Sequence, residues 1–183
     1  LATSVSPGHA ATLAFVHGKI LTATSTPLDD GTIVVRDGKI VSVGHAPPIP
    51  RDAQIVDLRG ATVTPGLIAA DTALGTVEVN SVAGTNDIRT SAVPLSAGVD
   101  VQYALNADST LLPVALLGGV TQAIVLPDVG ASEQGLARLF AGQGAAISLG
   151  HEGPILTRAK IGVVLELGES GAAHAGGSRA ADY

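Results

Sequence analysis

Residues 31–44 read GTIVVRDGKIVSVG, with two β-branched runs on either side of Asp37-Gly38. An Asp-Gly pair between such runs is the strongest short-range signal for a β-hairpin closed by a two-residue turn. The stretch therefore predicts two antiparallel strands, over residues 32–36 and 39–43.

The segments on either side of this hairpin have the same β-like character. Short apolar runs predict further strands over 13–16, 20–24, 54–58 and 61–64. His17-Gly18-Lys19 is predicted to turn the chain between the first two of these, and residues 25–31 to form a loop. Residues 1–62 are thus expected to fold as a small, mostly antiparallel β domain.

The pattern changes after Pro65-Gly66. Residues 67–74 are apolar without alternation, which predicts a strand buried on both faces, and a long polar loop is expected over 75–94. The remaining elements expected are a helix over 102–114 that Pro113 would break, a helical turn over 133–140, and strands over 120–126, 145–149 and 161–167. Strands spaced in this way suggest parallel βα units, so a second domain is predicted over 63–183.

Composition excludes several classes of protein. Hydrophobic residues make up 46% of the 183 residues, which is enough to bury a core, and no cysteine is present to form a disulfide, a thiolate nucleophile or a sulfur ligand. The net charge is −6 with scattered Lys and Arg, which argues against a nucleic-acid partner. No apolar stretch reaches the roughly 20 residues that a membrane span requires. A soluble globular protein is expected, and its charged fraction of only 14% suggests that something else covers part of its surface.

Three stretches in this order resemble the N-terminus of the amidohydrolase superfamily, of the imidazolonepropionase and dihydroorotase type. They are FVHGKI at 15–20, the hairpin at 31–44, and VDLRGATVTPGLI at 56–68; GVT at 119–121 is similar to the start of the second barrel strand. The resemblance implies a small β-sandwich of the composite, urease-like kind, followed by the first strands of a (β/α)₈ barrel that this chain leaves incomplete. It also implies hydrolysis of carbon–nitrogen bonds, including cyclic amides, by a metal-activated water.

The family's first metal ligands are a His-x-His pair that follows Pro-Gly-Leu-Ile after two residues. Residues i and i+2 of a strand point to the same side, so two imidazoles at this spacing reach one metal. Here Asp71 and Ala73 stand at these positions. Asp71 is the candidate oxygen ligand for a divalent metal, with zinc as the first choice, or a strand-end residue that bonds to neighbouring backbone; Ala73 cannot bind a metal. The other family ligands lie on later strands.

Further candidates follow predicted strands in the second domain. His151, Glu166 and Glu169 stand near strand ends, where the active mouth of a barrel gathers its loops, although a solvated surface position is the simpler interpretation of each. His174 lies in a Gly- and Ala-rich tail and is a poor first ligand. Ser178-Arg179 has no His or Asp partner at a recognisable spacing, so a serine nucleophile is not supported.

The other polar motifs are predicted to have structural roles. His17 and His45 fall in turns of the β domain and are expected at its surface, and Asp57 is expected to pack within the sandwich. Gly142-Gln143-Gly144 resembles a phosphate-binding turn, but GxG alone is weak evidence, and chance explains it in a chain with 23 glycines.

Two functions remain open. The first is an amidohydrolase-like enzyme that acts on a small molecule and whose site is completed outside this chain, by the rest of the barrel in the same gene product or in a second chain. A reduced, mononuclear ligand set from later residues would preserve that activity. The alternative is a degenerate, metal-free subunit that binds or supports an active paralogue. The chain is expected to be part of a larger protein that forms homo- or hetero-oligomers, with a lean towards export.

Overall fold

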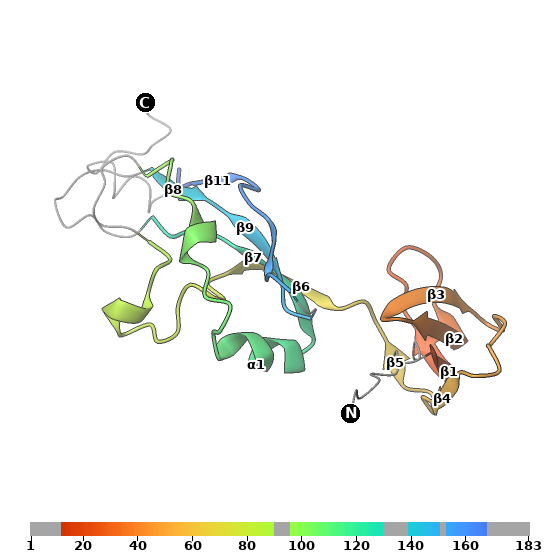
Figure 1. Cartoon of the computed structure of the whole chain (residues 1–183). Helices are drawn as coiled ribbons and strands as arrows, with labels where there is room; N and C mark the ends of the chain where they lie inside the picture. The colour runs from red at the N-terminus through yellow and green to blue at the C-terminus, as the bar shows by residue number, and fades with distance from the viewer. Residues whose placement is uncertain (1–11, 90–95, 130–138, 151–152, 168–183) are drawn as a thin grey trace, which may run out of the picture. The chain divides into compact units, whose positions relative to one another are not determined.

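The chain folds into two compact units, Leu1–Pro65 (unit 1) and Gly66–Tyr183 (unit 2), which are described separately. The computed structural model describes residues 12–89, 96–129, 139–150 and 153–167. Figure 1 shows that unit 1 consists of strands, whereas unit 2 combines strands with short helices. No helix in these described ranges is long and apolar enough to cross a membrane.

Unit 1 is a single five-stranded sheet in its described part, and it forms the β-sandwich-like portion of the fold. Its strands are β1 (Thr12–Ile20), β2 (Leu28–Arg36), β3 (Lys39–Gly44), β4 (Gln54–Asp57) and β5 (Thr62–Val63). β1, β2 and β3 pair antiparallel, but β4 and β5 both pair with β1 in parallel. The antiparallel prediction therefore fails for β4 and β5, because residues 45–53 carry the chain across to the far side of β1 before β4 begins.

The central hairpin is confirmed. Asp37 and Gly38 have φ angles of 53° and 70°, and Arg36 pairs with Lys39 directly across the turn. Positive φ at both central residues is the geometry whose twist matches that of the flanking strands. β2 begins at Leu28, so the loop predicted over 25–31 is shorter than expected.

The predicted turn at His17-Gly18-Lys19 is wrong, because β1 runs through it as one strand. The register against β2 shifts on both sides of Gly18, and His17 has a φ of 56°, so the strand is bulged here. A Cβ on Gly18 would lie 2.4 Å from Leu58 Cδ1. The glycine thus marks a close approach inside the sheet and not a chain reversal.

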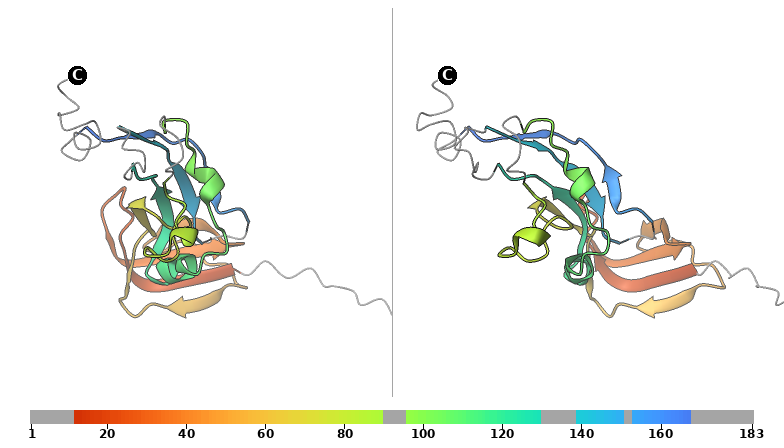
Figure 2. Two further views of the ribbon diagram at one scale, coloured as in Figure 1. Left: turned by 90° about the vertical axis from the view of Figure 1, so that its left-hand side faces the viewer. Right: turned by 60° about the vertical axis from the view of Figure 1, so that its left-hand side comes forward.

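Unit 2 is built on a four-stranded sheet in the order β10-β9-β7-β6, with β11 and β8 paired separately. Its strands are β6 (Leu67–Thr72), β7 (Val120–Val125), β8 (Phe140–Gln143), β9 (Ala145–Ser148), β10 (Leu156–Arg158) and β11 (Val163–Leu165). The long strands run side by side in both views of Figure 2. β6 and β7 are parallel and are joined by a connection that contains α1 (Leu111–Leu117), which confirms one βα unit.

The prediction of parallel pairing is wrong beyond β7. β9 pairs antiparallel with β7, and β10 antiparallel with β9. The chain leaves β7 at its carboxyl end and enters β9 at that same end, so that Val125 lies opposite Ala145. Gly144 permits this entry, because a Cβ there would lie 2.6 Å from Leu126 Cδ2.

The helix predicted over 102–114 is two elements, η2 (Val101–Ala104) and α1. The interruption lies before Pro113, which sits in the first turn of α1, where a missing N–H breaks no helical hydrogen bond. Within the loop predicted after β6, the described residues hold η1 (Ala83–Thr85) and an isolated bridge from Val77 to Asn86. The helical turn predicted over 133–140 lies mostly outside the described residues, and Phe140 begins β8.

A compact core fills the space between α1, η2 and the sheet of unit 2. Its fully buried members come from η2, α1, β7 and β9: Val101, Leu112, Ala123, Val125, Ala145 and Ile147. β6 does not share this burial, since Leu67 is 58% and Ile68 61% exposed. The prediction that this strand is buried on both faces is therefore wrong for the described chain, where β6 is an edge strand paired only with β7.

Candidate functional site

A cavity of about 400 Å³ opens where β6 and β7 end. Asp71 and Thr72 reach it from β6, Asp128 follows β7, and Glu166 follows β11. We call it the carboxylate cavity; its walls are Asp71, Thr72, Ala73, Ile88, Leu126, Pro127, Asp128, Val164 and Glu166. Residues at the carboxyl ends of parallel strands are those that α/β folds use for chemistry.

Backbone hydrogen bonds hold the segments that carry these carboxylates. Leu126 N donates to Thr72 O at 3.3 Å, which ties the end of β7 to the end of β6. Asp128 N donates to Ile88 O at 3.1 Å. The Asp128 carboxylate forms an ion pair with Arg89, with Oδ2 3.3 Å from Nη2. Asp128 is thus already balanced by a cation.

Glu166 differs from the other two carboxylates. Its backbone N–H donates to Leu139 O at 2.9 Å, yet Oε2 of its side chain is buried without a hydrogen-bond partner among the described residues. A buried acceptor without a donor is costly in a folded protein. Such atoms call for a specific explanation, of which a catalytic or binding role is one.

The first-strand position predicted for metal binding holds Asp71 at the cavity wall, where its side chain is exposed. Ala73 offers a methyl group, and Thr72 Oγ1 accepts a hydrogen bond from Leu74 N at 3.2 Å. Nowhere in the described ranges do three or more His, Cys, Asp or Glu side chains come together as a metal site. The described residues therefore do not by themselves fit the divalent metal that the resemblance implies.

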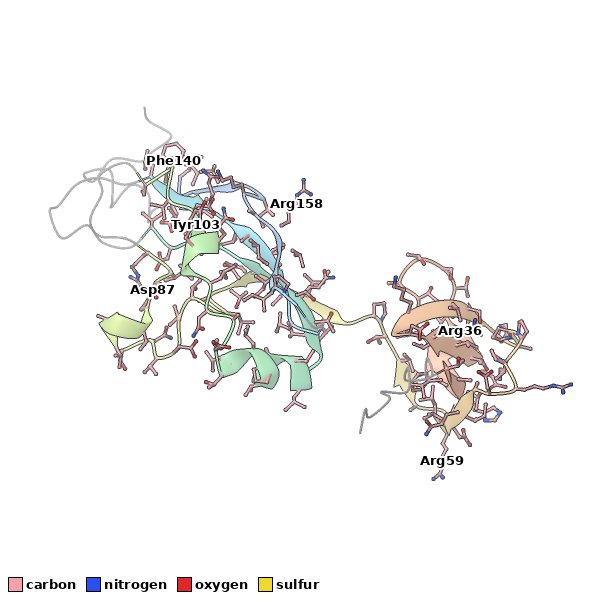
Figure 3. All side chains as sticks on the ribbon, in the orientation of Figure 1. Arg36, Arg59, Asp87, Tyr103, Phe140 and Arg158 are labelled. Atoms are coloured by element: carbon pink, nitrogen blue, oxygen red, sulfur yellow. The ribbon has the colours of Figure 1, made fainter. Side chains whose placement is uncertain are left out.

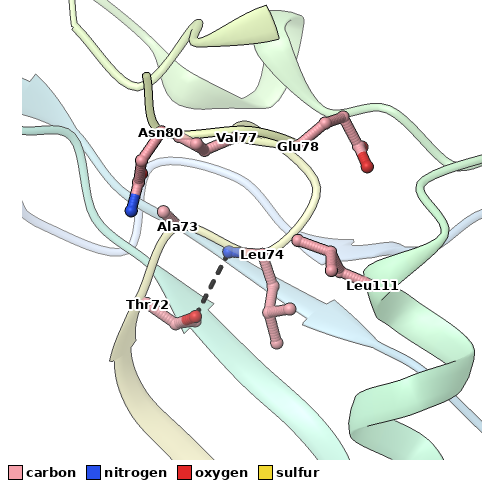
Figure 4. A pocket seen from close by; sticks show the side chains of 7 residues that line it. All are labelled: Thr72, Ala73, Leu74, Val77, Glu78, Asn80 and Leu111. Atoms are coloured by element: carbon pink, nitrogen blue, oxygen red, sulfur yellow. Dashed lines mark hydrogen bonds between the residues drawn. The ribbon is translucent and has the colours of Figure 1, made fainter. Parts of the chain in front are cut away.

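A second, smaller pocket of about 220 Å³ adjoins the first and shares Thr72 and Ala73 with it. We call it the Glu78 pocket, and Figure 4 shows its walls: Thr72, Ala73, Leu74, Val77, Glu78, Asn80 and Leu111. Sequence reasoning missed Glu78 and Asp128. Asp128 had a usable signal, since it directly follows a buried strand and a proline, whereas Glu78 had none within the polar loop.

His17 lies in β1 and His45 follows β3, and both are exposed, as predicted. His17 Nδ1 lies 3.1 Å from Asp57 Oδ1, and His45 Nδ1 lies 3.3 Å from Asp30 O. Asp57 does not pack inside the sheet as predicted, because it is exposed and acts through hydrogen bonds. The pKa of the Asp57 carboxyl lies below its usual range. The main cause is the Arg59 N–H, which donates to Oδ1 at 3.0 Å, and the second is the hydrogen bond with the His17 ring.

The remaining candidates contribute no described site. Gly142-Gln143-Gly144 spans the end of β8 and the approach to β9, and Gly142 has a φ of 132°. A Cβ on Gly142 would lie 2.6 Å from Val99 O, so close packing accounts for this glycine. His151, Glu169, His174, Ser178 and Arg179 lie outside the described residues.

The chain is similar to solved hydrolase structures. It has a small β unit and a parallel strand pair whose ends meet at a cavity. An amidohydrolase from Thermotoga maritima MSB8 matches over 88% of this chain with 25% sequence identity and a TM-score of 0.73. The match covers 40% of that protein, so the chain spans well under half of its length. The chain thus shares the fold of an amidohydrolase over most of its described length.

Two other solved structures resemble shorter parts of the chain. One is an amidohydrolase, at 29% identity over 37% of this chain and 17% of that chain, with a TM-score of 0.34. The other is a prolidase complexed with N-methylphosphonate-L-proline, at 27% identity over 38% and 17%, also with a TM-score of 0.34. No protein-family model and no curated relative matches the chain.

Proposed function

We propose that this chain carries the N-terminal part of an amidohydrolase-like hydrolase that cleaves carbon–nitrogen bonds outside peptides, cyclic amides included. The observation that carries the proposal is the carboxylate cavity, which lies at the ends of β6 and β7 in a fold shared with an amidohydrolase. A concave site at parallel strand ends, with a few converging polar groups, is a usual setting for a binding or active site.

Glu166 is the residue to which we assign the proton chemistry. Glu166 lines the cavity, and its Oε2 is buried without a donor among the described residues, so a water molecule or a substrate N–H that reached it would supply the missing hydrogen bond. A carboxylate within reach of a reacting water can act as general base. Asp128, already paired with Arg89, is less suited to take up a proton.

We propose a divalent metal, with zinc as first choice, for the complete protein and not for the described residues alone. Asp71 would supply one oxygen ligand, and the metal's chemistry would be to lower the pKa of a bound water. Because the described residues do not complete a ligand set, the other ligands must come from elsewhere in the protein. We assign no step of the reaction to the metal.

The rest of the barrel is the partner that this proposal requires. A further strand would pair with the edge of β6, where Leu67 and Ile68 are exposed. We propose that this strand belongs to the rest of the barrel, in the same gene product or in a second chain. The span of 40% of the similar amidohydrolase's length agrees with this view.

The experiment that tests the hydrolase proposal combines metal analysis with turnover. The full-length protein, purified with zinc or manganese present, should hold about one metal per subunit and hydrolyse members of a panel of amides, lactams and cyclic imides. Glu166→Gln should lower kcat by about 10²–10⁴-fold, as expected for loss of a general base. Asp87→Asn, which removes a carboxylate of the same charge from an exposed loop position, should retain full turnover.

A metal-free binding subunit is the second candidate. Ala73 at the second ligand position favours it, since a methyl group cannot replace an imidazole. Absence of metal and of turnover in the metal-replete protein, together with co-purification of an active paralogue, would establish this candidate and exclude the enzyme.

A further inference from the structure

Glu78 is the lining residue of the Glu78 pocket whose carboxylate is held by a hydrogen bond. Glu78 Oε1 accepts a hydrogen bond from Asn106 Nδ2 at 3.3 Å. Asn106 is itself fixed, because its N–H donates to Gly75 O at 2.6 Å and its Oδ1 accepts from Asp108 N at 3.0 Å. One carboxylate oxygen is therefore anchored, and the other has no hydrogen-bond partner among the residues that the structure describes.

The loop that carries Glu78 is cross-braced by hydrogen bonds. Glu78 N donates to Thr85 O at 3.0 Å, and Asp87 N to Thr76 O at 2.8 Å. Thr85 Oγ1 lies within hydrogen-bond distance of Val79 N and Val79 O, at 3.2 and 3.1 Å. Thr76, which accepts the Asp87 hydrogen bond, is only 4% exposed. Such a loop places a charge before any ligand arrives, which reduces the ordering cost of binding.

The remaining walls of the pocket are suited to an aliphatic chain. Ala73, Leu74, Val77 and Leu111 present hydrocarbon surface, and Figure 4 shows the loop residue Val77 across the pocket from Leu74. Among the residues that line it, Glu78 is the only one with a charge. An apolar wall beside one anchored carboxylate is complementary to a short alkyl chain that ends in a cation.

The pocket is too small to hold a complete substrate. At about 220 Å³ it lies below the 300–1,000 Å³ of ordinary ligand sites, and it adjoins the carboxylate cavity through Thr72 and Ala73. Because both linings include Thr72 and Ala73, a side group bound in the smaller pocket would lie near a reacting group in the larger one.

We propose that the Glu78 pocket is a specificity subsite that selects substrates with a cationic amine a few carbons from the amide bond to be cleaved. This inference rests on the proposed function, since it assigns the reacting bond to the carboxylate cavity. Glu78 would act as a specificity-determining residue that pairs with the ammonium group and takes no part in bond cleavage.

A matched pair of probes tests the subsite by binding alone. 5-Aminopentanamide and hexanamide have the same chain length and differ only in an ammonium group that replaces a methyl group. Their dissociation constants for the full-length protein are measured by ligand-observed NMR titration. The wild type should prefer the ammonium probe by about fivefold, the effect of a partly exposed ion pair. Raised salt should reduce that preference.

Glu78→Gln should abolish the preference while leaving the affinity for hexanamide unchanged, because glutamine still accepts the Asn106 hydrogen bond. Asp87→Asn, on the same loop and with the same loss of charge (Figure 3), should retain it. If the glutamine variant fails to fold, Glu78→Asp is measured in its place. It retains the charge and should preserve part of the preference for the ammonium probe.

Equal binding of both probes to the wild type, binding of neither, or an unchanged preference in Glu78→Gln would overturn the subsite. The hydrolase proposal fails separately. If the ammonium probe binds selectively but no amide in the panel is cleaved, the subsite stands and the proposed reaction is wrong.

Discussion

Replacement of Glu166 by glutamine should stabilise the protein. Oε2 of Glu166 is buried without a hydrogen-bond partner in the described part of the chain, and an unsatisfied buried polar atom costs about 1–3 kcal/mol. The side chain as a whole is only half-buried, so the lower end of that range applies. An amide has nearly the same shape and is less costly to bury than a charged carboxylate. We expect Glu166→Gln to raise the free energy of unfolding by about 1 kcal/mol.

The assay is equilibrium urea denaturation at pH 7, followed by circular dichroism, with the m-value compared between variants. Asp87→Asn is the control, because Asp87 is exposed and its removal should change stability by less than about 0.5 kcal/mol. A loss of stability in Glu166→Gln would refute the reasoning, since it would mean that the carboxylate has a structural partner. A gain of stability together with a loss of turnover would show that the fold tolerates this carboxylate for the sake of activity.

Three further predictions concern the fold. Ile147→Ala empties a position that is 1% exposed in the core of unit 2 and should cost about 2–5 kcal/mol in urea denaturation. Gly142→Ala should cost at least about 1–3 kcal/mol in the same assay, because φ is 132° and the new Cβ would meet Val99 O at 2.6 Å. The Arg59 N–H lowers the pKa of the Asp57 carboxyl in the folded protein. The ionised carboxylate therefore stabilises the fold at pH values above its unfolded pKa of about 4. This contribution is lost as the pH falls through the lower pKa of the folded state. Asp57→Asn should therefore be slightly less stable than wild type at pH 7, and urea titrations should show the difference closing as the pH falls below the unfolded pKa and through the lower, folded one.

Local patterns predicted those parts of the chain where the backbone conformation depends on neighbouring residues. The Asp37-Gly38 hairpin followed from two residues that tolerate positive φ between two β-branched runs. The same kind of reasoning fails at His17-Gly18, where the glycine predicts a turn but β1 continues. Its real cause is Leu58, forty residues away, whose side chain fills the space that a Cβ would need. Contact with a distant residue leaves no trace in the local pattern.

The candidate site shows a similar division. Asp71 could be located from the sequence because it stands at a fixed distance from the Pro65-Gly66 motif, and Glu166 because it ends an apolar run. That these two residues line one cavity with Asp128 depends on the parallel pairing of β6 with β7 and on the position of β11. The spacing of these residues along the chain does not predict that they line the same cavity.

The sequence by itself determined the hairpin, the change of character after Pro65-Gly66, the resemblance to amidohydrolases and the absence of imidazoles from the first ligand positions. Each of these depends on residue identity and on short-range backbone preference. Only the tertiary structure decided that β9 runs antiparallel to β7, that β6 is an exposed edge, and that Glu78 stands beside the carboxylate cavity. These features depend on which strands lie next to each other in the fold. Packing between segments tens of residues apart decides that arrangement.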